Sequence, residues 1–180
     1  MDLITRLLQG LASRIRSAFY RARGVQIRGP ISLRAIEVRR RAASIIIDHG
    51  AALDRGVTLL ATSDDARIAI GASVYINRQT IIAAEELIEI GDGCMIGPFC
   101  YLTDHDHTFG PGTAPAAGPL ISQPVRIERR CWLGAHVTVL KGVTIGAGTV
   151  VGAGSVVTKS LPAGVVAVGN PARVVRTLGA

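Results

Sequence analysis

Apolar residues recur at every sixth position through the second half of the chain. The series is Ile127, Leu133, Val139, Ile145, Val151 and Val157, and the next position is often glycine. Earlier series run Ile70, Ile76, Ile82 and then Ile90, Ile96, Leu102; a phase shift of two residues between them indicates a small insertion near residues 84–89. One such unit cannot bury its own apolar face, but stacked units can, so the repeat predicts a solenoid.

Each six-residue unit is typical of one short strand and a tight corner, with the aliphatic residue pointing inward and glycine allowing a crowded turn. Backbone hydrogen bonds would then run between coils, so we expect an all-β fold, a parallel β-helix. Cys94, Cys100 and Cys131 each follow a repeat aliphatic by four residues and lack the spacing of a zinc site. We therefore expect them to be small core residues.

The repeat divides the chain into three parts. Residues 1–24 form an expected N-terminal helix, residues 25–176 the β-helix domain, and residues 177–180 a tail. Within the domain the repeat is blurred over residues 25–69, which predicts irregular first coils, and residues 61–67 are expected to protrude. The repeat also stops over residues 104–126, where Gly110, Pro111 and Gly112 begin a Gly/Pro-rich stretch. We expect a protruding loop there, of the kind that often carries function.

The N-terminal segment is amphipathic, with arginines between apolar residues spaced three and four apart. The apolar residues are Leu3, Ile4, Leu7, Leu8, Leu11, Ile15 and Phe19. Two roles stay open for this stripe: packing against the open end of the coil or a neighbouring subunit, or lying on an anionic membrane surface. Because Arg6, Arg14 and Arg16 interrupt the apolar stretch, no signal-peptide core is expected and the protein is expected in the cytoplasm, at the inner membrane face if the helix binds lipid.

The composition of the chain limits the kinds of protein that it can be. The chain has 180 residues, 48% of them hydrophobic, which fits one folded domain. The net charge of +7 is concentrated at the N-terminus, where residues 1–41 contain ten arginines against Asp2 and Glu37. Such a patch suits nucleic acid, but the few aromatic residues there offer no stacking platform, so we expect no nucleic-acid partner. The uncharged stretch 142–158 is too rich in Gly and β-branched residues for a membrane-spanning helix.

The residues best suited to chemistry are the tetrapeptide Asp-His-Asp-His, at positions 104–107. In an extended segment, His105 and His107 would project to one side and Asp104 and Asp106 to the other. A histidine with a partner that fixes its tautomer can remove a proton from a hydroxyl near neutral pH. The mouth of a protruding loop on a β-helix is a plausible position for such a base.

Several segments together resemble a known family. They are Ile-Gly-Asp-Gly-Cys-Met-Ile-Gly-Pro (90–98), Arg-Cys-Trp-Leu-Gly-Ala (130–135), Val-Leu-Lys-Gly-Val-Thr-Ile-Gly (139–146), Val-Val-Thr-Lys (156–159) and Gly-Asn-Pro-Ala-Arg-Val-Val-Arg (169–176). The chain is similar, over about residues 68–176, to the hexapeptide-repeat acyltransferases of the maltose/galactoside O-acetyltransferase-like branch. The resemblance implies a left-handed β-helix assembled as a homotrimer, with active sites between subunits. It implies direct acetyl transfer from acetyl-CoA to a hydroxyl, usually of a sugar, without a metal.

The resemblance also implies roles for individual residues. The family's histidine lies sixteen residues after the Gly of Ile-Gly-Asp; counted from Gly91 this is His107, which we prefer, with His105 as its rival if the loop is two residues shorter. Asn77, Asp104 and Trp132 would meet the acceptor. The expected acetyl-CoA contacts are Trp132, Gly134, Ala135, Ala153, Thr158, Lys159, Arg173 and Arg176.

Two other functions compete with this one. A non-catalytic β-helix scaffold would have no affinity for CoA. A zinc hydratase of the carbonic-anhydrase type uses the same coil but needs three metal histidines, and His105, His107 and His136 lack the H-x-x-x-x-H arrangement expected there. Departures from the sugar acetyltransferases at the N-terminus and after His107 argue against a small free sugar as the acceptor. The basic N-terminal helix suggests a glycan or lipid-linked precursor near the inner membrane face.

Overall fold

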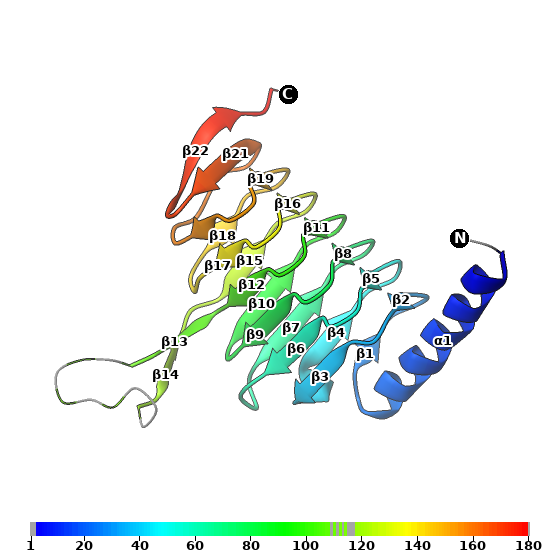
Figure 1. Cartoon of the computed structure of the whole chain (residues 1–180). Coiled ribbons are helices and arrows are strands. Elements are labelled where there is room, and N and C mark those ends of the chain that lie inside the picture. The colour runs from blue at the N-terminus through cyan, green and yellow to red at the C-terminus, as the bar shows by residue number, and fades with distance from the viewer. Residues whose placement is uncertain (1–2, 109, 111, 113, 115–117, 180) are drawn as a thin grey trace.

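The protein is a β-solenoid with one N-terminal helix, which confirms the predicted fold (Figure 1). The computed structural model describes residues 3–108, 110, 112, 114 and 118–179; the prediction of a protruding loop falls partly outside these residues. Helix α1 (Leu3–Ala22) comes first, and a short 3-10 helix, η1 (Ala42–Ser44), lies in the first coils. All other regular elements in the described part are strands.

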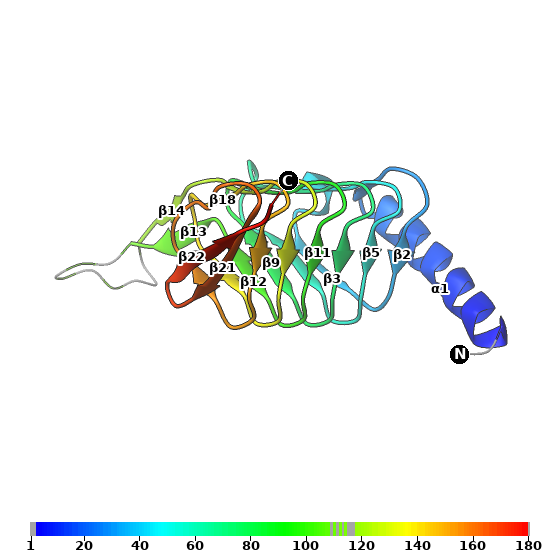
Figure 2. The ribbon, with the colours of Figure 1, turned by 90° about the horizontal axis from the view of Figure 1, so that it is seen from above.

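Three sheets, parallel except for the antiparallel pair β21–β22, form the sides of a prism whose coils stack in a row (Figure 2). The first sheet contains β1 (Gln26–Ile27), β4 (Ile45–Ile47), β7 (Arg67–Ile70), β10 (Leu87–Ile90), β15 (Val125–Ile127) and β18 (Thr144–Ile145). The second contains β2 (Ser32–Leu33), β5 (Ala52–Leu53), β8 (Tyr75–Ile76), β11 (Met95–Ile96), β16 (Trp132–Leu133), β19 (Val150–Val151), β21 (Val165–Gly169) and β22 (Ala172–Thr177). The third contains β3 (Glu37–Arg40), β6 (Thr58–Ala61), β9 (Ile81–Ala84), β12 (Tyr101–Thr103), β17 (Thr138–Val139) and β20 (Val156–Val157).

The six-residue period is the spacing between equivalent positions of successive sheets. Ile90, Ile96 and Leu102 lie on β10, β11 and β12, one in each sheet, and all three are buried. Directly above and below them stand other repeat aliphatics, such as Ile70 and Ile127 beside Ile90. The core is therefore a stack of aliphatic layers, each sealed by the next coil.

The first coils are more regular than the sequence analysis predicted. Ile47, Leu53 and Leu59 are six residues apart, buried, and carried by one strand of each sheet. The prediction of irregular coils over residues 25–69 is therefore wrong for the coil formed by β4, β5 and β6. The blurring comes mainly from the corner where the chain passes from the third sheet to the first and carries extra residues, 41–44 and 62–66. In the first coil, Leu33 and Val38, which pair with Leu53 and Leu59, are also only five residues apart.

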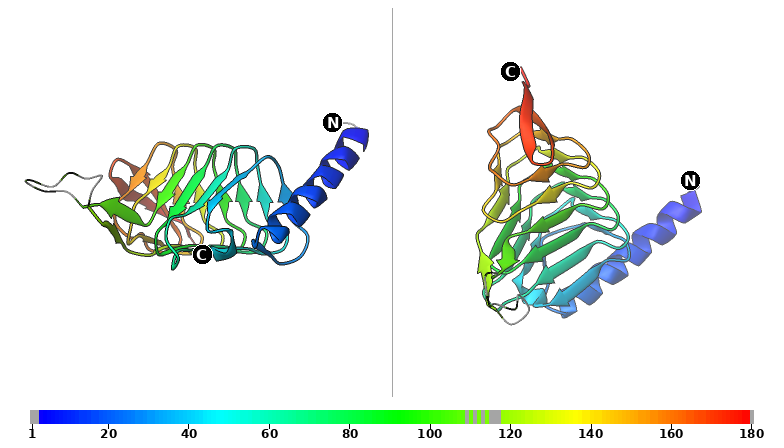
Figure 3. Two further views of the ribbon diagram at one scale, coloured as in Figure 1. Left: turned by 90° about the horizontal axis from the view of Figure 1, so that it is seen from below. Right: turned by 60° about the vertical axis from the view of Figure 1, so that its left-hand side comes forward.

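Helix α1 lies across the N-terminal end of the prism, against β1 and β2 (Figure 3). Among the side chains of α1 that the structure describes, the buried ones are Ser13, Ser17 and Tyr20, not those of the apolar stripe. Of the predicted stripe, the side chains of Leu3 and Ile4 lie outside the description, and Leu7, Leu8, Leu11, Ile15 and Phe19 are exposed. The helix thus caps the open end of the coil, which was one of the two predicted roles, but it does so through Ser13, Ser17 and Tyr20 and not through the exposed residues of the stripe. Within the described residues, no helix is both long and apolar enough to span a membrane.

Candidate functional site

The candidate site lies at the corner between the third and first sheets, where β12 leaves the coil. The chain there forms an antiparallel hairpin, β13 (His105–His107) with β14 (Leu120–Ser122), which projects from the prism on the side away from α1 (Figure 1). The sequence analysis predicted a loop here and missed this strand pairing, which the Gly and Pro residues between the strands gave no reason to expect.

Asp104, at the bend between β12 and β13, is fully buried and accepts four hydrogen bonds. Its Oδ1 accepts from the backbone N–H of Glu85 at 2.8 Å and lies 2.9 Å from His105 Nδ1. Its Oδ2 accepts from the backbone N–H groups of Glu86 and Leu87, at 2.8 and 2.7 Å. The carboxylate therefore joins the hairpin to the neighbouring coil.

These bonds correct two expectations about Asp104. The residue does not point away from His105 as in a regular strand, because the bend turns its carboxylate back under residues 85–87. It also cannot contact an acceptor, because its oxygens are sealed from solvent and already engaged. The donors come from the two-residue insertion near residues 84–89 that the repeat revealed, but nothing in the sequence linked that insertion to Asp104.

His105 is the histidine that the fold holds in place. Its side chain is 13% exposed, and Nδ1 lies between Asp104 Oδ1 at 2.9 Å and Thr103 Oγ1 at 3.5 Å. The Thr103 hydroxyl also donates to the backbone carbonyl of His105, at 3.1 Å. Because Asp104 acts as the acceptor, Nδ1 carries the hydrogen, and Nε2 is left with a lone pair.

His107, which the sequence count favoured, lies one pair further along the hairpin, opposite Leu120, and is exposed. The hairpin is fixed to the coil at its base. Lys141 Nζ, on the next coil, lies 3.7 Å from Asp106 Oδ2, and Ser122 Oγ donates to Glu86 Oε2 at 3.0 Å. Sequence reasoning gave Lys141 no role at the site.

A second group of predicted residues lies at a different corner, between the second and third sheets. Asn77 follows β8, Gly134 and Ala135 follow β16, and Ala153 follows β19. Asn77 is half-buried, with its Oδ1 accepting from the backbone N–H of Arg78 at 2.8 Å. Trp132, on β16, is 49% exposed and stands in register with Met95 and Val150 on the outer face of the second sheet. Within one chain the prism separates this corner from His105.

Gly134 is required by the coil itself. A Cβ at this position would lie 2.6 Å from the backbone nitrogen of Ala153 on the next coil. The absence of a side chain at Gly134 thus has a packing reason independent of any ligand. Ala135 and Ala153 are small residues on the open side of the same corner, half-buried and exposed respectively.

Thr158 and the three cationic residues predicted to contact CoA lie toward the C-terminal end of the prism. Thr158 and Lys159 follow β20 and are exposed, and Arg173 and Arg176 lie exposed on β22. Arg173 Nη1 donates to the carbonyl of Ala172, at 3.0 Å. Exposed cations at one end of the coil suit a ligand with several phosphates.

The described residues contain no cluster of three His, Cys, Asp or Glu side chains that could hold a metal ion within one chain. His136 stacks on Phe99 at the corner between the second and third sheets, with ring centroids 5.0 Å apart. It is therefore separated from His105 and His107, and the three histidines do not converge in the monomer.

The comparisons with known proteins agree with the hexapeptide-repeat fold. Residues 124–159 match the family model described as bacterial transferase hexapeptide, with six repeats. Nodulation protein L of Rhizobium leguminosarum bv. viciae is 48% identical over 107 residues, which are 59% of this chain and 56% of that protein. Galactoside O-acetyltransferase of Escherichia coli is 38% identical over 111 residues, 62% of this chain and 54% of that protein. The chain thus spans about half the length of the curated relatives it matches.

Solved structures extend the likeness to nearly the whole chain. A hexapeptide-repeat-containing acetyltransferase of Vibrio cholerae, complexed with acetyl coenzyme A, superposes with a TM-score of 0.68 at 25% identity. The match covers 93% of this chain and 78% of that one. The predicted resemblance is confirmed: this chain carries the hexapeptide repeat of the bacterial transferases, wound into the coil that the hexapeptide-repeat acetyltransferases share.

Proposed function

We propose that the protein is an acetyl-CoA-dependent O-acetyltransferase whose acceptor is a hydroxyl of a sugar or glycan precursor. The observation that carries the proposal is the Asp104–His105 pair, built into a corner of a hexapeptide-repeat coil with Nε2 of His105 available as a base. Curated relatives named galactoside O-acetyltransferase and a structural relative complexed with acetyl coenzyme A support the substrate classes.

In this mechanism His105 is the base and Asp104 its positioning residue. Nε2 takes the proton of the acceptor hydroxyl as the oxygen attacks the thioester carbonyl. The C–S bond breaks, the ester forms, and the proton passes from His105 to the departing thiolate of CoA. A buried acceptor on Nδ1 keeps the ring in the required tautomer throughout. His107 is the alternative base, and it is placed second because it is exposed on the hairpin whereas His105 is held at the base of the hairpin by the buried Asp104.

The site is proposed to be completed by a neighbouring subunit. Asn77, Trp132, Ala135 and Ala153 lie at a corner that His105 of the same chain does not share. That corner is flanked by exposed apolar side chains: Tyr75, Met95 and Trp132 on the second sheet, Phe99 at the turn, and Ile81 and Tyr101 on the third. A contiguous exposed apolar patch is typical of a protein interface. A homotrimer would bring the His105 corner of one subunit against this patch of the next.

Acetyl-CoA fits the residues along this patch and the C-terminal end. Lys159, Arg173 and Arg176 would hold the phosphates of CoA, and the small side chains of Ala135 and Ala153 would leave room for its pantetheine arm. Trp132 would line the groove near the acceptor.

The test is release of free CoA thiol during turnover with a panel of sugar and glycan acceptors. We expect His105→Ala to lower kcat by about 10²–10⁴-fold, while acetyl-CoA still raises the melting temperature of the variant. His107→Ala is the matched control and should keep most of the activity. The reverse pattern would reject His105 as the base. No acetyl-CoA binding by the wild type would favour a scaffold, and stoichiometric zinc would favour the hydratase.

A further inference from the structure

Helix α1 docks on the solenoid through polar groups. Ser13 Oγ donates to the carbonyl of Ile31 at 3.1 Å and accepts from the N–H of Leu33 at 2.8 Å. The buried Tyr20 hydroxyl donates to the carbonyl of Ile36 at 2.7 Å. On the same side, Arg16 donates to the carbonyl of Leu33 and Arg21 to those of Ile27 and Gly29. These bonds satisfy carbonyls of the first coil, which has no preceding coil to pair with.

The opposite side of the helix is apolar and uncovered. Leu7, Leu8, Leu11, Ile15 and Phe19 are between 56% and 64% exposed. Their spacing places them within about one third of the helix circumference, and Ser13, Ser17 and Tyr20 occupy the remaining arc that faces the coil. An apolar stripe that points away from its own protein needs another apolar environment to be covered.

The charges around the stripe have one sign. The sequence of α1 contains four arginines and no acidic residue, and Arg23 follows directly. By helical spacing Arg14 and Arg21 border one edge of the stripe, and Arg16 and Arg23 the other. The guanidinium of Arg23 lies 5.7 Å from the ring centre of Phe19. Arginines at the edges of an apolar stripe are arranged as in helices that lie in the interface of an anionic membrane.

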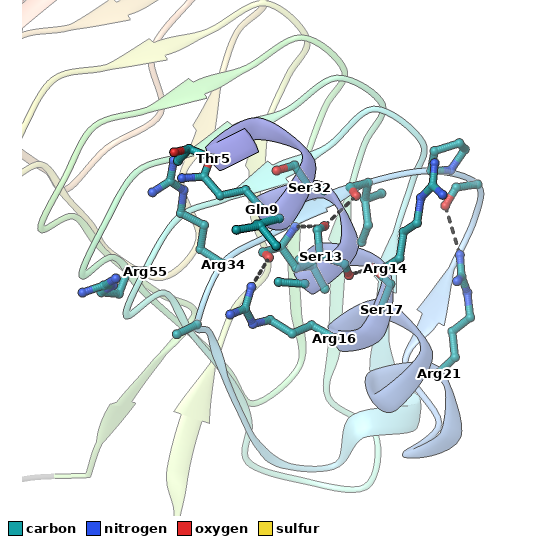
Figure 4. A pocket seen from close by; sticks show the side chains of 18 residues that line it. Thr5, Gln9, Ser13, Arg14, Arg16, Ser17, Arg21, Ser32, Arg34 and Arg55 are labelled. Carbon is teal, nitrogen blue, oxygen red and sulfur yellow. Dashed lines mark hydrogen bonds between the residues drawn. The ribbon is translucent and has the colours of Figure 1, made fainter. Parts of the chain in front are cut away.

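The pocket between the helix and the first coil is also lined by positively charged residues. Its volume is about 720 Å³. Leu8 of the stripe lines this pocket. Arg16, Arg34 and Arg55 line it too, as Figure 4 shows. Arg34 is partly neutralised by Asp54, with Nε and Oδ1 3.4 Å apart, whereas no ion pair of Arg16 or Arg55 is found among the described residues. An anionic headgroup at the edge of the stripe would meet cations here too.

We propose that the outward face of α1 is a docking surface for an anionic lipid bilayer. The helix would lie in the plane of the interface, with Leu7, Leu11, Ile15 and Phe19 among the acyl chains and the arginines at the phosphates. A second copy of the chain is the less suitable occupant, because packing two such faces together brings arginine rows against each other without an acidic residue in α1 to pair with them. This proposal does not depend on the proposed reaction.

The experiment is co-sedimentation of the full chain with phosphatidylcholine vesicles that either contain or lack about 30% phosphatidylglycerol. We expect binding to the anionic vesicles only, weakened by salt. Leu7→Ser/Leu11→Ser/Ile15→Ser should reduce binding by at least about tenfold, and Arg14→Gln/Arg23→Gln should reduce it and its salt dependence. Val175→Ser, an equally exposed apolar residue on β22 at the other end of the coil, is the matched control and should bind as the wild type.

Circular dichroism and thermal melting of each variant show that it is folded, which we expect because these side chains face away from the coil. The proposal is overturned if the serine variant binds anionic vesicles as well as the wild type does. Equal binding of the wild type to vesicles with and without phosphatidylglycerol would overturn it as well. It is also overturned if no vesicle binds while the serine variant changes the mass of the assembly, because the stripe would then be covered by another copy.

Discussion

Four hydrogen-bond donors converge on the carboxylate of Asp104, and three of them are backbone N–H groups of the adjacent coil. A carboxylate held in this way cannot rotate, so it fixes the position of the imidazole ring of His105, which is hydrogen-bonded to it. At the scale of single residues, the candidate site therefore depends on a side chain that touches neither substrate. Asp104 also contributes to stability, because loss of its charge leaves buried donors without acceptors.

Asp104→Asn is expected to lower kcat by about 10²-fold while the KM for acetyl-CoA changes little. The amide can accept at only one of its two ends, so His105 loses its fixed tautomer and at least one backbone N–H is left unpaired. The melting temperature should also fall. Asp106→Asn is the control. Asp106 is partly exposed, and its ion pair with Lys141, at 3.7 Å, is long and weak, so loss of its charge should alter kcat by about twofold or less. A proportional rise in KM with kcat intact in Asp104→Asn would assign Asp104 to binding instead.

The cysteines allow a test of the core. All three are buried, and burial raises the pKa of the Cys100 thiol above its usual value. A thiol with a raised pKa holds less of the reactive thiolate at every pH below that pKa. We therefore expect no alkylation of Cys100 by iodoacetamide in the native protein at pH 8, and full alkylation of Cys94, Cys100 and Cys131 in denaturant. Rapid native labelling of Cys100, read by mass spectrometry, would contradict the packing.

At the scale of elements, the corner between the third and first sheets differs from the other two. Every one of the first four coils carries extra residues there, ending with the β13–β14 hairpin. The other corners are tight, because coils approach closely where glycine or alanine turns the chain. A Cβ on Gly97 would lie 2.6 Å from the carbonyl carbon of Gly134. Insertions, and with them the site, collect at the one corner where the coil tolerates them.

Gly97→Ala is expected to lower the free energy of unfolding by about 1–3 kcal/mol, because the new methyl group meets backbone atoms that cannot move aside. Gly10→Ala is the matched control. A Cβ on Gly10 meets nothing within 4 Å, and alanine in a helix interior should raise the free energy of unfolding by about 0.5–1 kcal/mol. Urea unfolding of both variants gives the comparison, and equal effects of the two substitutions would refute the tight corner.

At the scale of the whole molecule, the repeat alone predicted the coil, since each buried aliphatic follows from one six-residue count. The count failed where insertions interrupt it, as at residues 41–44 and 62–66. The direction of α1 was not predictable, because amphipathicity shows that two faces differ and not which one meets the protein. The choice between His105 and His107 depended on the bend at Asp104 and on donors twenty residues earlier, and neither is visible as a local pattern.

The position of the site residues on two corners of the prism leads to a prediction about the assembly. Suppose that each site is formed by the corner of one subunit that carries His105 and the corner of the next subunit that carries Asn77. A subunit with His105→Ala then still contributes an intact Asn77 corner to a site. We expect each of His105→Ala and Asn77→Ala to be poorly active alone. Co-expressed with different tags and purified through both tags as mixed trimers, they should regain about one third of wild-type activity, because one of the three pairings in every mixed trimer joins two intact halves.

Light scattering gives the control, with a mass of about three times the 18.8 kDa of one chain expected for the wild type and for the mixed species. Trp132→Glu places a charge within the exposed apolar patch and should shift that mass toward the monomer and abolish the regained activity. Mixed trimers as inactive as the single variants would place both halves of the site in one chain. Because the prism separates the two corners within a subunit, that result would also require the roles assigned to Asn77 and His105 to be revised together.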